Sequence, residues 1–142
     1  MTTTYYWTAW LRNKAMDYAF SAAAWTPPAT LWVGLAESVA DNGEITGEPS
    51  GSNYGRVSFT NNVENLPAAS SGAKFVNINI VFNAATGSWG TPTVAFLSDS
   101  ETGNTNTLLW GTISNSRAIG SGDTVYFAPG ADINIALTGV ES

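Results

Sequence analysis

The chain has 142 residues, the usual size of one domain, and only 11% of them are charged, with a formal net charge of −6. It contains no cysteine and no histidine, which excludes a Ser-His-Asp triad, a Cys-His pair and any zinc site with His or Cys ligands. The five cations are scattered, and no apolar run approaches the roughly 20 residues that span a membrane, so we expect neither nucleic acid nor a membrane as a partner.

Residues 8–22 carry the helix prediction. Five side chains fall on one face at helical spacing: Leu11, Ala15, Tyr18, Ala19 and Ala22. Thr8 is the predicted N-cap. Pro27 and Pro28 are predicted to end the helix, because proline cannot continue it.

After residue 30 the apolar residues alternate with a period of two, which is typical of strands. The clearest strand is 74–83, where Val76, Ile78, Ile80 and Phe82 share one face. Further strands are predicted over 30–37, 54–60, 91–98, 107–114, 117–121, 123–129 and 131–138. About eight short antiparallel strands indicate a mainly β chain, a single β-sandwich or jelly-roll-like domain with an N-terminal helix. We assign residues 1–10 to an N-terminal interaction segment and 11–142 to that domain.

Carboxylates are the remaining acid-base groups, and they gather in two predicted loops, at Asp41, Glu44 and Glu48 and at Asp99 and Glu101. A glycosidase needs two carboxyls at a defined separation across a cleft, and calcium needs several spaced oxygen ligands. Acids in surface loops are more often simply solvated. We therefore predict no catalytic residue and no cofactor and assign no metal site, while calcium in the loop DNGE (41–44) or SDSETGN (98–104) stays an open alternative.

Six tryptophans raise the question of a sugar site. Trp32 and Trp110 lie within predicted strands, where packing is the better interpretation. Trp25 lies at a turn, and so does Trp89, in the stretch AATGSWGTPTVAFLSD over 84–99. Each of these two is either a stacking platform for a sugar ring or part of the core. Glycan binding is therefore possible but not favoured.

The start of the chain is aromatic, with Tyr5, Tyr6, Trp7 and Trp10. An exposed aromatic cluster marks an interface, but the same segment can fold back over its own sandwich, and both interpretations stay open. Arg56, in NYGRVSF, is either a surface ion-pair partner or a bidentate anchor at a subunit contact. These five residues form the candidate partner interface.

The order of the motifs resembles that of a family of small virion proteins of tailed phages. It runs from LRNKAMDYAF through PPATLWVGLAES, EPSGSNYGRVSF, FNAATGSWGTPTVAFLSD and LLWGTIS to GSGDTVYFAPGADINIAL. The resemblance covers about residues 11–138 and implies an all-β virion component that is not an enzyme. At Val94 and Ala95 the chain departs from the family's Thr-His pair. The positions that carry the family pattern are expected to determine the fold: Tyr54, Gly55, Arg56, Trp89, Gly90, Asp99, Gly122, Asp123 and Phe127.

Members of such a family are regarded as head-decoration (cement) proteins or are called tail fibre or minor tail proteins. From the resemblance we expect a capsid decoration protein on the outer head surface of the virion. It would form a homotrimer and stabilise contacts between subunits of the major capsid protein. The alternative is a tail-associated or tail-fibre protein with receptor- or glycan-binding character, and a third hypothesis is a carbohydrate-binding module or a glycan-active enzyme.

Overall fold

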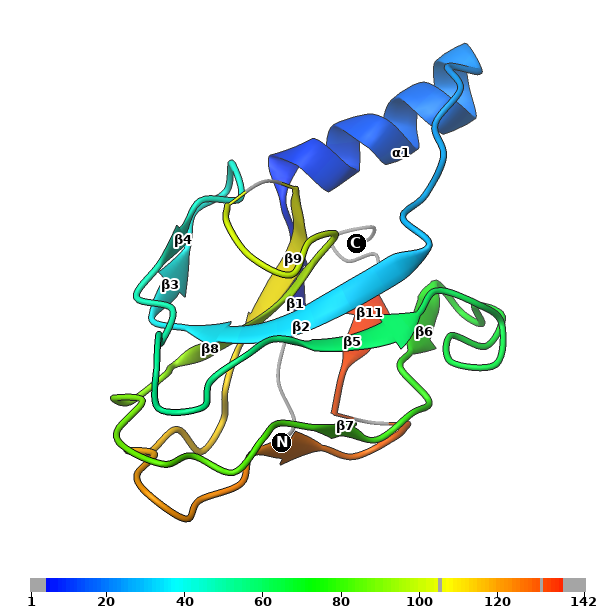
Figure 1. Cartoon of the computed structure of the whole chain (residues 1–142). Helices are drawn as coiled ribbons and strands as arrows, with labels where there is room; N and C mark the ends of the chain where they lie inside the picture. Colours follow the sequence, from blue (N-terminus) through cyan, green and yellow to red (C-terminus); the bar gives the residue numbers. More distant parts are fainter. Residues whose placement is uncertain (1–4, 105, 131, 137–142) are drawn as a thin grey trace.

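The computed structural model describes residues 5–104, 106–130 and 132–136 (Figure 1). Within them the chain is mainly β with a helix near the N-terminus, which confirms the predicted fold class. The elements in chain order are β1 (Tyr5–Trp7), α1 (Ala9–Ser21), β2 (Thr30–Ala36), β3 (Ser38–Val39), β4 (Ile45–Thr46), β5 (Val57–Thr60), β6 (Ala73–Phe75), β7 (Ile80–Val81), β8 (Val94–Ser98), β9 (Thr107–Thr112), β10 (Tyr126–Phe127) and β11 (Asn134–Ala136).

Five strands form one antiparallel sheet in the order β1-β9-β8-β2-β5, and the ladders β7–β10, β6–β11 and β3–β4 have two strands each. Figure 1 shows β7 and β10 on the far side of a gap from the five-stranded sheet. Side chains fill that space: Val33 and Leu35 of β2 belong to the same buried cluster as Ile80 and Phe127 of the ladder. The main core thus lies between the sheet and the β7–β10 ladder, as in a small sandwich.

The other face of the sheet carries a smaller core under the β3–β4 hairpin. Val39 and Ile45 of the hairpin are buried against Phe96 of β8. Gly34 of β2 pairs with Phe96 in the register. A Cβ at Gly34 would lie 2.3 Å from the Phe96 ring, so only glycine fits there. Every residue of β8 is therefore buried, which is why the strand lacks the alternation of polar and apolar residues.

Two of the predicted segments do not form a single strand each. The segment 74–83 forms two short strands, β6 and β7, although Val76, Ile80 and Phe82 point inward as expected. The segment 117–121 makes only a single bridge, between Gly90 and Ile119. The segment 131–138 is confirmed over β11, and residues 131, 137 and 138 lie outside the described residues.

The helix begins as predicted and ends earlier than predicted. The Thr8 hydroxyl accepts a hydrogen bond from the Leu11 N–H at 3.3 Å, which confirms the N-cap, and it donates to the Thr107 carbonyl at 2.6 Å. Ala22, in the left-handed conformation with φ 50°, closes the C-terminus through its N–H to Asp17. The prolines at 27 and 28 are therefore not what stops the helix.

Candidate functional site

The aromatic N-terminus is built into the domain. β1 is an edge strand of the five-stranded sheet and pairs with β9, with Tyr6 opposite Trp110. Tyr5 is buried in the main core, where burial raises the pKa of its hydroxyl, and Trp7 packs against the same cluster. Tyr6 is exposed, with its ring centroid 4.8 Å from that of Trp110. The expectation of a separate interaction segment over 1–10 is thus corrected for residues 5–10, and Tyr5 is not available to a partner.

Trp10 lies at the base of α1 and is only partly buried. Its ring meets Trp25 edge to face at 6.0 Å, and the Lys14 ammonium lies 6.0 Å from its centroid. Trp10, Lys14 and Trp25 line an open groove together with Asp99 and Asn106. The two tryptophans therefore pack on each other and still reach solvent.

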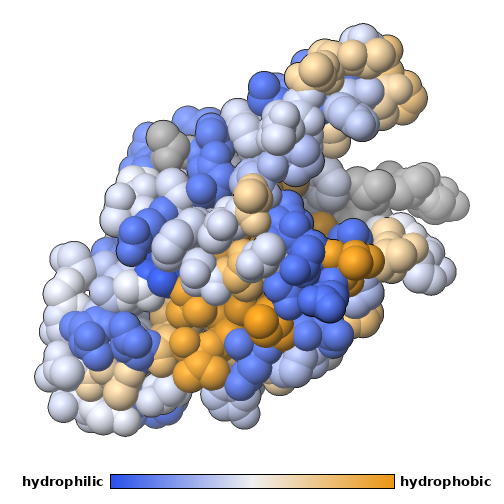
Figure 2. Space-filling view, turned by 45° about the vertical axis from the view of Figure 1, so that its right-hand side comes forward, coloured by the Kyte–Doolittle hydropathy of each residue, from blue (hydrophilic) through white to orange (hydrophobic). Residues whose placement is uncertain are grey.

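Beyond its first turn, α1 stands clear of the body (Figures 1 and 2). Leu11 is its one buried residue among those described. Phe20 is 84% exposed, Tyr18 60% and Met16 58%, which is unusual for side chains of this size. The predicted apolar face of the helix therefore does not pack on its own domain, with Leu11 as the exception. We call Met16, Tyr18 and Phe20 the helix tip.

The helix tip is apolar on two opposite sides. Met16 and Phe20 are four residues apart and share one side, whereas Tyr18 lies seven residues after Leu11 and continues the other side. Large apolar side chains that gather on an exposed surface mark an interaction site. The predicted aromatic interface lies upstream of the helix tip, over 5–10. A sequence signal for the tip is the absence of any charged residue between Asp17 and Glu37.

Arg56 lies inside the molecule and not at its surface. Its Nε and Nη2 atoms donate to the two Glu48 carboxylate oxygens, each at 2.7 Å. Nη1 donates to the Ser100 carbonyl at 2.8 Å and Nη2 to the Gly103 carbonyl at 2.7 Å. The guanidinium carbon lies 4.9 Å from the ring centroid of Phe96. With a side chain 1% exposed, Arg56 is unavailable to a neighbouring subunit, which corrects that expectation.

Tyr54 extends the same network. Its hydroxyl donates to Glu48 at 2.8 Å and accepts from the Leu35 N–H at 2.9 Å. Burial raises the pKa of this hydroxyl. We call Glu48, Tyr54 and Arg56 the Arg56 network. It ties the 48–56 segment to β2 and to the loop that follows β8.

Trp89 lies in the core and offers no platform for a sugar ring. It is 5% exposed, its indole Nε1 donates to the Ser52 carbonyl at 2.9 Å, and its ring meets Tyr54 edge to face at 5.2 Å. Gly90 follows with a positive φ of 75°, a backbone conformation that suits glycine. The turn thus delivers Trp89 inward, and of the two interpretations the core is the one that the structure adopts.

Four of the five remaining motif positions have a turn or core role that the structure shows. At the fifth, Gly55, the backbone has no positive φ and a Cβ would meet nothing within 4 Å, so its expected role in determining the fold stays a prediction. Gly122 has φ +91°, and Asp123 accepts from the Gly120 N–H at 2.9 Å in the same turn. Asp99 accepts from the Asn106 amide at 2.8 Å. Phe127 is fully buried. These contacts lie within the turns and core of the chain, and we interpret them as structural.

The acids are dispersed. Asp41 forms a bidentate pair with Arg12, both distances being 3.0 Å, whereas Glu48 belongs to the Arg56 network. Within the described residues, no three His, Cys, Asp or Glu side chains come together in a way that could hold a metal ion. None of the described helices has the length and apolar character needed to cross a membrane.

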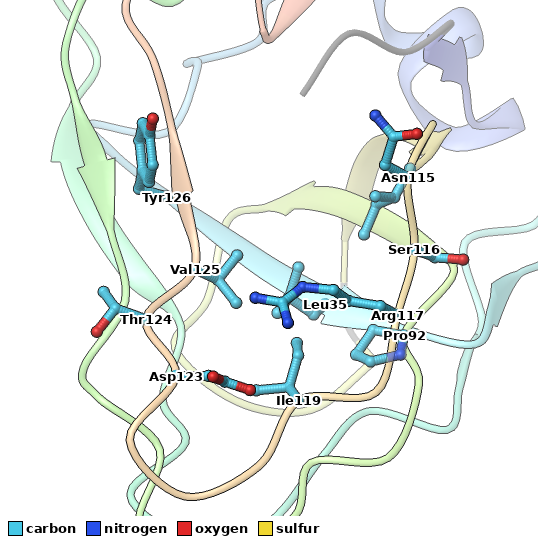
Figure 3. A pocket seen from close by; sticks show the side chains of 11 residues that line it. Leu35, Pro92, Asn115, Ser116, Arg117, Ile119, Asp123, Thr124, Val125 and Tyr126 are labelled. Carbon is cyan, nitrogen blue, oxygen red and sulfur yellow. The ribbon is translucent and has the colours of Figure 1, made fainter.

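A pocket of about 270 Å³ lies between the segment that follows β9 and the segment that leads into β10 (Figure 3). Arg117 extends into it, and Asp123 and Tyr126 also line it. In the sequence, Arg117 is one of five scattered cations. The available signal was the lack of any acid between Glu101 and Asp123, so that no neighbour in the sequence pairs with it.

Comparison with known proteins places the chain in a family. The family model described as podophage GP4 fiber I protein gp80 matches residues 6–134, which span the sheet, α1 and most of the described residues. None of the curated proteins matches the sequence. The family is one of structural phage proteins, as the order of motifs led us to expect. The chain belongs to the podophage GP4 fiber I protein gp80 family and is a virion structural protein of the tailed-phage type.

Proposed function

We propose that the chain is a structural subunit of a phage fibre at the tail, without enzymatic activity. The observation that carries this proposal is the match over residues 6–134 to a family named for a fibre protein. The same match gives less support to a decoration protein on the head surface, which the sequence resemblance had favoured. Virion association is common to both.

The helix tip is the attachment surface in this proposal. Met16, Tyr18 and Phe20 leave apolar area on both sides of a helix that its own domain does not cover. A fibre subunit has to be joined to the particle, and a 13-residue helix with few supporting contacts is only marginally stable alone. The proposed occupant is another protein of the virion, which would enclose the tip between apolar side chains.

A homotrimer remains part of the proposal. A symmetric oligomer presents several helix tips at once, so that individually weak contacts add up through avidity. Tyr6, which is exposed on edge strand β1, and Trp10, which is partly exposed in the first turn of α1, are further candidates for partner contact.

Location and copy number on the particle test the proposal. Gold labelling of an affinity tag on the protein in purified virions should mark the tail, and a stained gel should show few copies per particle. Labelling over the head, with hundreds of copies per particle, would instead identify a decoration protein bound to the major capsid protein.

A further inference from the structure

The pocket of Figure 3 lies at the end of the molecule away from α1 (Figure 1). Its floor is apolar and comes from distant parts of the chain: Leu35, Ile113, Ile119 and Val125 are all buried. Its volume of about 270 Å³ is at the lower limit for small-molecule sites, so it has room for one compact group.

Arg117 is the cation of this pocket, and it is unpaired. Figure 3 shows its guanidinium reaching across the floor beside Ile119 and Val125. Over the described part of the chain, Arg117 has no hydrogen bond, ion pair or ring contact, whereas Arg12 and Arg56 each hold a carboxylate. In a chain with a net charge of −6, a free guanidinium aimed into a pocket is suited to an anionic group from outside.

Asp123 narrows the choice of anion. Its Oδ2 is engaged by the Gly120 N–H, and across the described residues it forms no ion pair with Arg117. The Asp123 carboxylate would repel a doubly charged phosphate bound near Arg117. It would accept hydrogen bonds from hydroxyl groups of a ligand. A ligand with one negative charge and several hydroxyls therefore suits both Arg117 and Asp123.

The rest of the lining suits a sugar. Asn115, Ser116 and Thr124 are further polar residues of the lining, although Figure 3 shows the hydroxyls of Ser116 and Thr124 turned outward, and Tyr126 is an exposed aromatic residue at the edge. The apolar floor suits the C–H face of a sugar ring. A phosphate, sulfate or simple aliphatic carboxylate would use only part of this set.

We infer that this pocket binds a uronic acid residue of an acidic polysaccharide, with its carboxylate on Arg117 and its hydroxyls toward Asp123. This ligand is a candidate receptor group on a host surface. The inference does not depend on where the fibre is attached, because the pocket and the helix tip lie at different ends of the chain.

The test uses the purified full chain, labelled with ¹⁵N and titrated with D-galacturonic acid and, separately, with D-galactose. The two sugars differ in that a carboxylate replaces a CH₂OH group. Galacturonic acid should shift the amide signals of residues 113–126, and galactose should bind at least about tenfold more weakly. Arg117→Gln should lower the affinity for galacturonic acid by about tenfold or more, because it removes a charge-assisted bidentate contact.

Lys74→Gln is the matched control, since it makes the same change in net charge outside this pocket, and its affinity should equal that of the unaltered protein. Arg117 is exposed, so its variant should fold, which the unperturbed spectrum checks. The inference is overturned if galacturonic acid shifts none of these signals, if galactose binds equally well, or if Arg117→Gln binds like Lys74→Gln. It is also overturned if a Glu-containing tripeptide binds as tightly as the sugar acid, which would indicate a peptide site.

Discussion

The Arg56 network and the helix tip both reverse the usual distribution of polar and apolar side chains. In the first, a guanidinium is buried, whereas in the second, a phenylalanine is 84% exposed. The difference is in their partners. Arg56 has an acceptor on each of its donating nitrogens, whereas Phe20 has no packing partner in the main core. The first is therefore explained by contacts within the chain, and the second is the basis of the attachment surface proposed above.

The largest effect is expected from breaking the Arg56 network. Arg56→Ala removes the ion-pair partner of the partly buried Glu48 carboxylate, which keeps the Tyr54 hydroxyl as a donor, and takes one donor from each of two loop carbonyls. Removing one partner of a buried pair costs about 3–5 kcal/mol of the free energy of unfolding. Urea denaturation measures this change. Arg117→Ala, at an exposed cation, is the control and should change stability by less than about 0.5 kcal/mol. Equal losses in both variants would mean that the network is not what distinguishes Arg56.

A smaller loss is expected at Trp89. Trp89→Phe keeps an aromatic ring but leaves the Ser52 carbonyl without the indole donor, which should cost roughly 1–3 kcal/mol. Trp7→Phe is the matched control, because the Trp7 indole N–H is buried with no acceptor among the described residues, so its removal loses no hydrogen bond. Thermal unfolding should therefore show a larger decrease in melting temperature for Trp89→Phe. The reverse order would contradict the role given to the Ser52 contact.

The fold could be predicted wherever a strand has one or two buried faces or a helix has its own cap. Alternation located β2 and β9, and Thr8 located the start of α1. The break between β6 and β7 could not be predicted, because it depends on distant backbone groups. The Val76 N–H donates to the Ile133 carbonyl and the Asn77 N–H to the Asn65 carbonyl, and both bonds join segments far apart in the sequence.

The candidate site was harder to predict than the fold. Helical spacing put Tyr18 on the same side as Leu11, but whether that side is covered depends on how far the sheet reaches beneath α1. Similarly, the sequence gives the positive charge of Arg117 but not its surroundings. Its pocket exists only because Leu35, Ile113 and Val125 converge from three parts of the chain. The sequence allowed Trp89 to be either a sugar-stacking platform or a core residue, and its contacts with Ser52 and Tyr54 decide for the core.

A weaker effect is expected at the base of α1, where the helix is held to the 41–44 loop. The Ala9 N–H donates to the Asp41 carbonyl, and Arg12 pairs with the Asp41 carboxylate, which lowers the pKa of that carboxyl below its usual 3.8. A lowered folded pKa means stability that is present above pH 3.8 and lost as pH falls through the folded value.

Asp41→Asn tests this contribution. The variant should melt below the unaltered protein at about pH 7, and the gap should narrow as the pH falls below the ordinary pKa of an aspartate, because the carboxyl of the unaltered protein is then increasingly protonated. Glu44→Gln, in the same loop, forms no ion pair among the described residues and should give no such gap. A gap that stays constant across this pH range would show that the ion pair is not its source.

The smallest effect on stability, and the sharpest test of the comparison, is expected at the helix tip. Replacing Met16, Tyr18 and Phe20 together by Gln keeps good helix formers at positions that their own domain does not cover. The free energy of unfolding should therefore stay within roughly 0.5 kcal/mol per site, whereas phage carrying the variant should incorporate much less of this protein into particles. Val63→Gln, at a residue 70% exposed elsewhere, controls for loss of exposed apolar surface and should leave incorporation intact. If the triple variant unfolds readily instead, the tip is covered within the chain itself. If it is incorporated as well as the Val63 control, another surface joins the chain to the virion.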